Sequence, residues 1–155
     1  MSLAFYRAHP ERARALLIID TGPGFKKDDA REAWNIRALG TADKLDQEGL
    51  AMLKSATRER ATASHRNARG LALAARGMLS QRDARVIELL PDIKVPSLIV
   101  VGAEDTPFLA ASDYMAAKIP GAQKIVIPAA GHAVNIDQPK AFVDAVLPFL
   151  KNLPA

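Results

Sequence analysis

The sequence predicts an α/β fold in which about three parallel strands are flanked by helices. Three short apolar runs carry this prediction, at residues 15–19, 98–101 and 124–127. Each run ends in a turn signal, and a segment of helical period separates the second run from the third. A strand, a helix and a second strand in this order imply a right-handed crossover between two parallel strands. A chain of 155 residues can bury the core of one such domain.

The first elements in the chain are a helix and a buried strand. Residues 2–9 are predicted to form a helix with Leu3 and Tyr6 on its buried side, and Pro10 stops it. Residues 15–19 read Ala-Leu-Leu-Ile-Ile, a continuous apolar run that suits a strand covered on both faces of a parallel sheet. The segment that follows, residues 20–24, then breaks the strand sharply.

A helical insertion is predicted between the first strand and the second. Apolar positions recur at helical spacing around residues 34–45, again over 50–53, and again over 71–79. Glycines in this region are potential breaks between the helices. The expected domains are a core of residues 1–24 and 91–155 and a helical lid of residues 25–90.

A last helix is predicted after the third strand. Pro139 suits one of its first positions. Phe142, Val146 and Phe149 recur at spacings of four and three, so they mark one buried face. Pro148 is expected to bend or shorten this helix.

Two polar residues follow the second and third predicted strands. Asp105 closes a turn that begins at Gly102, and His132 follows Gly131. The carboxyl ends of parallel strands meet at one edge of a sheet, where ligands gather. There a carboxylate can hydrogen-bond an imidazole, fix its tautomer and stabilise its protonated form. Glu104 is the rival carboxylate, but its side chain should point away because it lies one residue earlier.

Composition narrows the classes of function. The absence of cysteine excludes disulfides, thiolate metal sites and a cysteine nucleophile. The net charge of +4 is spread over arginines between residues 58 and 76 with few aromatic neighbours, which argues against a nucleic-acid partner. No apolar run reaches the roughly 20 residues that span a bilayer, and the N-terminus lacks a secretion signal. We expect a cytoplasmic protein with no membrane partner, no metal and no cofactor, because no histidine and carboxylate cluster has metal-ligand spacing.

Several short motifs surround the two polar residues in a characteristic order. They are Ile93-Lys94-Val95-Pro96, the turn Gly102 to Asp105, Ile119-Pro120-Gly121-Ala122, Gly131-His132 and Gln138-Pro139. In this order they resemble the C-terminal portion of the α/β-hydrolase fold superfamily, from the helix after the nucleophile to the acid and base strands. The resemblance implies a partial α/β-hydrolase fold with a helical lid, Asp105 as the catalytic acid and His132 as the catalytic base.

The resemblance also implies a substrate pocket and a class of substrate. The side chains expected to bind substrate are Trp34, Met52, Met78 and Leu79 from the lid, with Phe108 and Val134 beside the acid and the base. The activity implied is hydrolysis of a small, fairly apolar ester, lactone or related substrate, without a cofactor.

The nucleophile of the family is missing from this sequence. Its G-x-S-x-G elbow is expected just upstream of residue 1, and Ser2 has neither a preceding strand nor the small neighbours that the elbow requires. We therefore expect a truncated chain, inactive alone, that forms a homodimer or takes its N-terminal half from a longer chain. Two alternatives stay open. An aspartate nucleophile in the full-length form would give an epoxide hydrolase or dehalogenase, and a protein without a nucleophile would be a ligand-binding or remnant α/β-hydrolase-like protein.

Overall fold

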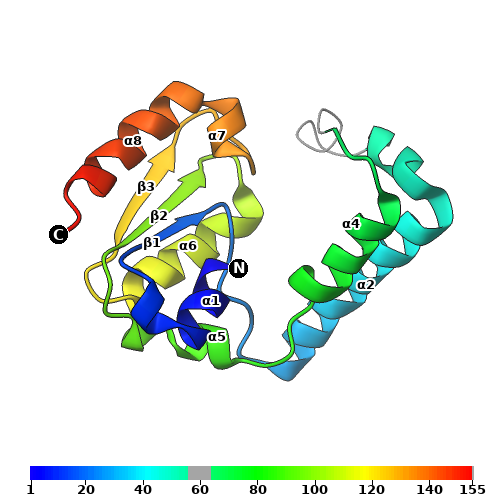
Figure 1. Ribbon diagram of the computed structural model, residues 1–155, viewed down its shortest axis with the longest axis horizontal. Coiled ribbons are helices and arrows are strands. Elements are labelled where there is room, and N and C mark those ends of the chain that lie inside the picture. Colours follow the sequence, from blue (N-terminus) through cyan, green and yellow to red (C-terminus); the bar gives the residue numbers. More distant parts are fainter. Residues whose placement is uncertain (56–63, 155) are drawn as a thin grey trace. The chain divides into compact units, whose positions relative to one another are not determined.

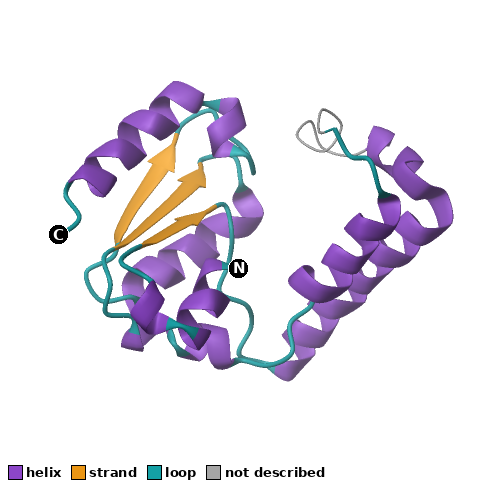
Figure 2. Cartoon of the chain, in the orientation of Figure 1, coloured by secondary structure: helices purple, strands orange, loops and turns teal. Residues whose placement is uncertain are grey.

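The computed structural model describes residues 1–55 and 64–154, which form two compact units. One unit comprises Met1–Pro23 and Arg85–Ala155, and the other comprises Gly24–Ala84. The described strands all belong to the first unit, and the second is built of helices and loops (Figure 2). Arg58 and Arg60, which contribute to the scattered positive charge, lie outside the described residues.

The first unit is organised around a three-stranded parallel sheet in the order β1-β2-β3 (Figure 1). The strands are β1 (Leu16–Ile19), β2 (Ser97–Gly102) and β3 (Gln123–Ile127). In register, Ile18 lies opposite Ile99 and Val100 lies opposite Ile125. The predicted α/β fold with three parallel strands is therefore confirmed.

Burial along the strands follows their place in the sheet. Every residue of the central strand β2 is buried. Along β1, buried residues alternate with half-buried ones. The prediction was a strand buried on both faces, but Leu17 and Ile19 are only half-buried. The reason is that β1 lies at the edge of the described sheet and pairs with β2 alone.

Helices cover both faces of this sheet. They are α1 (Ser2–Ala8), α5 (Arg85–Glu88), α6 (Thr106–Lys118), α7 (Val134–Asp137) and α8 (Pro139–Lys151), with short 3₁₀ turns η1 (Pro10–Arg12) and η4 (Leu90–Asp92). Helices α6 and α8 lie on opposite faces (Figure 1). On the α8 side, Leu98 and Val100 pack with Val146 and Phe149 in one apolar cluster. None of the described helices is both long enough and apolar enough to cross a membrane.

The end of the chain differs from its prediction in two ways. The predicted single helix is preceded by a separate short helix, α7, which begins two residues after His132. Helix α8 continues through Pro148 to Lys151, so Pro148 does not shorten it. Pro148 lies in the last turns, where the carbonyl group that loses its partner is that of the exposed residue Asp144 and can bond to water.

The second unit consists of a long helix packed against a shorter one. It contains α2 (Asp28–Glu48), the 3₁₀ segment η2 (Gly49–Ser55), α4 (Ala68–Ala74) and a π-helical turn η3 (Ala75–Leu79). Its core is small, with Ala42, Leu45, Ala72 and Ala75 fully or almost fully buried. Of the glycines considered as breaks, Gly49 ends α2 with a φ of 64°, whereas Gly40 lies inside that helix.

Candidate active site

The turn after β2 places Asp105 at the start of α6. Two backbone hydrogen bonds hold this turn. The Ala103 N–H donates to the Ile127 carbonyl and the Glu104 N–H donates to the Ala130 carbonyl, both at 2.9 Å. The turn requires glycine at position 102, because a Cβ there would lie 2.2 Å from the Ala130 carbonyl oxygen. The close approach of these two segments brings the tip of β2 next to the loop after β3. The Asp105 side chain is only 3% exposed.

The loop after β3 presents His132 beside this turn. The Gly131 N–H donates to Asp137 Oδ2 at 2.9 Å, and Gln138 Nε2 donates to the Ala129 carbonyl at 3.0 Å. These bonds tie the loop to the α7 region, and the His132 side chain remains 44% exposed. The loop is thus fixed at its backbone while the imidazole stays accessible.

Asp105 and His132 meet at hydrogen-bonding distance. Their Oδ2 and Nδ1 atoms are 2.9 Å apart, although the residues are 27 positions apart in sequence. In the neutral imidazole, a proton on Nδ1 can be donated to this carboxylate, which leaves Nε2 free to accept a proton from another group. Glu104, the rival carboxylate, is exposed, and it is Asp105 that contacts the imidazole.

Phe108, one turn into α6, supports the imidazole from its face. The two rings stack with centroids 4.8 Å apart and planes inclined by 26°. Phe108 is half-buried. Phe108 is one of the predicted substrate-binding residues, and its ring lies against the predicted base.

The other predicted wall residues have different surroundings. Val134 is fully buried and belongs to the apolar cluster under α8. In the second unit, Trp34 Nε1 donates to the Leu79 carbonyl at 2.7 Å, and Met52 packs against the alanine-rich core. Met78 and Leu79 are exposed, at 57% and 42%. The role of all the predicted wall residues in substrate binding stays a prediction.

A further residue beside this pair, Asp20, was not predicted from the sequence patterns. It follows β1 directly, is 8% exposed and has a left-handed φ of 44°. Its carboxylate accepts hydrogen bonds from the backbone N–H groups of Gly102 and Val134. Burial raises its pKa, an effect that those two bonds oppose. The available signal was an aspartate directly after a buried strand, at the same end of the sheet as Asp105.

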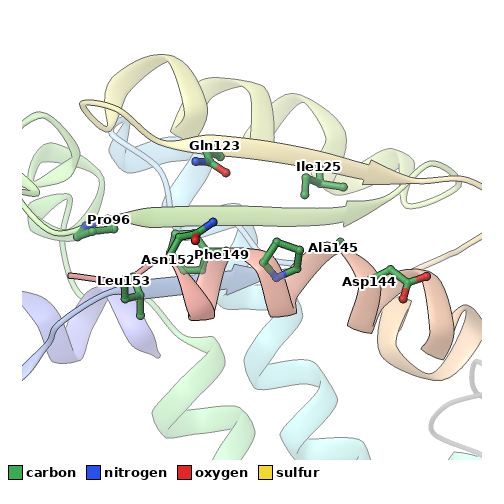
Figure 3. A pocket seen from close by; sticks show the side chains of 9 residues that line it. Pro96, Gln123, Ile125, Asp144, Ala145, Phe149, Asn152 and Leu153 are labelled. Atoms are coloured by element: carbon green, nitrogen blue, oxygen red, sulfur yellow. The ribbon is translucent and has the colours of Figure 1, made fainter. Parts of the chain in front are cut away.

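A separate cavity lies at the other end of this sheet. Its volume is about 340 Å³, and it opens between β2, β3 and α8 (Figure 3). The residues that line it are Pro96, Gln123, Ile125, Asp144, Ala145, Pro148, Phe149, Asn152 and Leu153. Pro96 precedes β2 and Gln123 begins β3, whereas Asp105 and His132 follow the carboxyl ends of these strands. The cavity is therefore not part of the Asp105–His132 site.

No group of three or more histidine, aspartate or glutamate side chains is placed to hold a metal ion within residues 1–55 and 64–154. The arrangement at this end of the sheet is a buried carboxylate hydrogen-bonded to an accessible imidazole. Such a pair can act as a general base oriented by a carboxylate.

Comparisons with known proteins agree with this geometry. A family model described as "Alpha/beta hydrolase family" matches residues 2–145. A putative 2-succinyl-6-hydroxy-2,4-cyclohexadiene-1-carboxylate synthase of Bacillus subtilis (strain 168) is 26% identical over 99% of this chain and 62% of its own length. Among solved structures, MenH from S. aureus gives a TM-score of 0.84 at 22% identity, covering 97% of this chain and 63% of that one.

A thermophilic esterase from Thermogutta terrifontis (malate bound) gives a TM-score of 0.78 at 26% identity, covering 99% of this chain and 61% of that one. The chain thus spans less than two thirds of the length of these relatives, which agrees with a partial domain. Because the family model covers most of the sequence, the chain belongs to the α/β-hydrolase family.

Proposed function

We propose that Asp105 and His132 are the acid–base pair of a hydrolase that acts on a small, fairly apolar ester, lactone or related substrate. One observation carries the proposal: the 2.9 Å contact between Asp105 Oδ2 and His132 Nδ1. The carboxylate is buried at 3% exposure and the imidazole is 44% exposed. A buried orienting carboxylate and an accessible imidazole are the arrangement that a general base requires.

The proposed mechanism assigns each side chain one task. His132 Nε2 accepts the proton of the nucleophile as the nucleophile attacks the carbonyl carbon, and an acyl-enzyme forms as the leaving group departs with a proton from His132. His132 then takes a proton from water as the water oxygen attacks the acyl carbon, and it returns that proton to the nucleophile as the acyl–nucleophile bond breaks and the acid product leaves. Asp105 holds the Nδ1–H tautomer and stabilises the imidazolium that forms in each half-reaction.

The nucleophile is proposed to lie on a segment outside this sequence. The family resemblance assigns it to a G-x-S-x-G elbow upstream of residue 1, and the chain spans 62% of the B. subtilis synthase. The relatives named above include an esterase and a carboxylate synthase. One fold supports several reactions. The proposal of an ester or lactone substrate is therefore based on the acid–base chemistry and not on the names of these relatives.

The test is hydrolysis of p-nitrophenyl esters with acyl chains of different length. The 155-residue chain would be assayed beside a form extended through any upstream in-frame strand and elbow. We expect turnover in the extended form, and losses of about 10³- to 10⁴-fold in kcat for His132→Ala and Asp105→Asn. Lys140→Ala, a substitution on the exposed face of α8, is the control and should retain activity.

Turnover that survives both substitutions would reject the assignment of the pair. Ester binding without turnover in the extended form would favour the ligand-binding alternative. Epoxide or haloalkane turnover, with an aspartate at the elbow, would favour the second alternative.

A further inference from the structure

Asp20 is a buried carboxylate that links two segments far apart in the sequence. Its Oδ1 accepts the Gly102 N–H at 3.2 Å, and its Oδ2 accepts the Val134 N–H at 3.0 Å. Its own N–H donates to the Val100 carbonyl at 3.0 Å, which fixes the residue at the tip of β1. One side chain after β1 therefore bonds to backbone at the end of β2 and to backbone beyond the end of β3.

The two amide groups that Asp20 holds flank the acid–base pair. Gly102 opens the turn that ends at Asp105, and Val134 lies two residues after His132. Asp137 also anchors the His132 loop, through the Gly131 N–H. Asp137 thus ties the His132 loop to α7. Asp20 ties both that loop and the Asp105 turn to the residue that follows β1.

The position is an unfavourable one for an aspartate unless these bonds compensate. A non-glycine residue in the left-handed region carries backbone strain, and Asp20 has a φ of 44°. Burial also penalises the charged carboxylate, and the nearby charge of Asp105 adds to this penalty. Strain and a buried charge at one residue beside a candidate site indicate a task that glycine could not perform there.

We propose that Asp20 is a positioning residue, which sets the spacing of the β2 turn and the β3 loop so that His132 Nδ1 stays bonded to Asp105. This inference rests on the proposed function for its catalytic meaning. Asp20 acts through backbone N–H groups and not on the substrate. Its loss should therefore alter the state of the imidazole without removing any reacting group.

Two substitutions remove the link in different ways. Asp20→Asn retains the shape of the side chain and tolerates a left-handed backbone no less well than aspartate, but its amide offers one acceptor oxygen, so only one of the two N–H groups keeps its partner. Asp20→Gly removes both bonds and relieves the backbone strain. Asp144→Asn, on the exposed face of α8, is the matched control for the change from carboxylate to amide.

The first readout is the tautomer of His132, measured by ¹H–¹⁵N NMR on the labelled chain near pH 8.5, where imidazoles are ordinarily neutral. His132→Gln identifies its signals among the three histidines. We expect the wild-type protein and Asp144→Asn to hold the Nδ1–H form. Both Asp20 variants should shift toward a mixture of tautomers, so that the two ring ¹⁵N shifts move toward each other, in the same direction as in Asp105→Asn.

The second readout is kinetic. In a form that hydrolyses p-nitrophenyl esters, the Asp20 variants should lower kcat by about tenfold or more, because small misplacement of a catalytic group is costly. KM should stay within about twofold, since no substrate contact is lost.

Two results would overturn the proposal. One is a wild-type His132 tautomer in folded Asp20→Asn and Asp20→Gly proteins, and the other is loss of the folded state in both variants, which would make Asp20 a folding residue. Absence of ester turnover in the extended form would instead reject the proposed function, while the tautomer measurement would still decide the role of Asp20.

Discussion

In the first unit the interior is made of large aliphatic and aromatic side chains from the strands and α8, whereas in the second it is made mostly of alanine. Leu98, Val100 and Phe149 contribute to the first interior. Ala42 and Ala72 are fully buried in the second, where Leu45 is the largest of the buried residues. Large buried side chains remove more apolar area from water, so each residue of the first core stabilises its unit more.

The polar groups of the two units also differ. In the first unit, the carboxylates of Asp20 and Asp105 are buried and bond to backbone N–H groups or to His132. In the second, Arg76 of η3 pairs at the surface with Asp43 and Asp46 of α2. Buried polar bonds fix geometry closely, whereas exposed ion pairs contribute little and are screened by salt. The candidate site thus lies in the unit whose buried polar bonds fix the side-chain geometry more closely.

The largest expected effect comes from a matched pair of core truncations. Leu98→Ala should destabilise the first unit by about 3–4 kcal/mol, since a cavity remains where the side chain was. Leu45→Ala should remove the main apolar contact of the second unit and open α2, while the sheet keeps its protection. Hydrogen exchange, measured separately on peptides from β2 and from α2, checks the expected destabilisation of each unit.

Equal loss of protection in both units after Leu45→Ala would contradict this difference between the two units. The two interiors would then unfold together, and their different composition would not give them different stability.

A second pair of substitutions should have opposite signs in the two units. Gly102→Ala should cost about 3 kcal/mol and displace Asp105, because the new Cβ would overlap the Ala130 and Gly131 carbonyl oxygens. Gly40→Ala should instead stabilise the protein by about 1 kcal/mol, since Gly40 is inside α2 with nothing within 4 Å of the added Cβ. Chemical denaturation measures both changes, and destabilisation by Gly40→Ala would contradict the open surroundings of that residue.

The smallest expected effect is a pH dependence confined to the first unit. Burial raises the pKa of Asp20 above 3.8, with the nearby charge of Asp105 acting in the same direction and His132 and the two backbone N–H groups opposing it. The folded protein therefore holds this proton at pH values where the unfolded chain has released it. The stability that this difference contributes is present below about pH 3.8 and is lost as the pH rises through the raised pKa.

The measurement is urea unfolding of wild-type protein and Asp20→Asn between about pH 4 and pH 8. The difference in unfolding free energy, wild type minus variant, should fall as the pH rises and then level off. A difference that rises with pH would mean that the folded protein favours the ionised form of Asp20.

The fold class and the meeting of Asp105 with His132 could both be predicted from the sequence. Apolar runs ending in turns predict strands because both signals are local, and Asp105 and His132 follow such runs directly. Since parallel strands end at one edge of the sheet, their proximity could be predicted as well.

The surroundings of that pair depend on tertiary packing. The hydrogen bonds of Asp20 join residues 82 and 114 positions apart, and no local pattern specifies such partners. Tertiary packing likewise placed Phe108 against the imidazole and Val134 in the core. The physical reason is that local sequence sets strand, helix and turn, whereas burial and long-range bonds depend on which segments pack together.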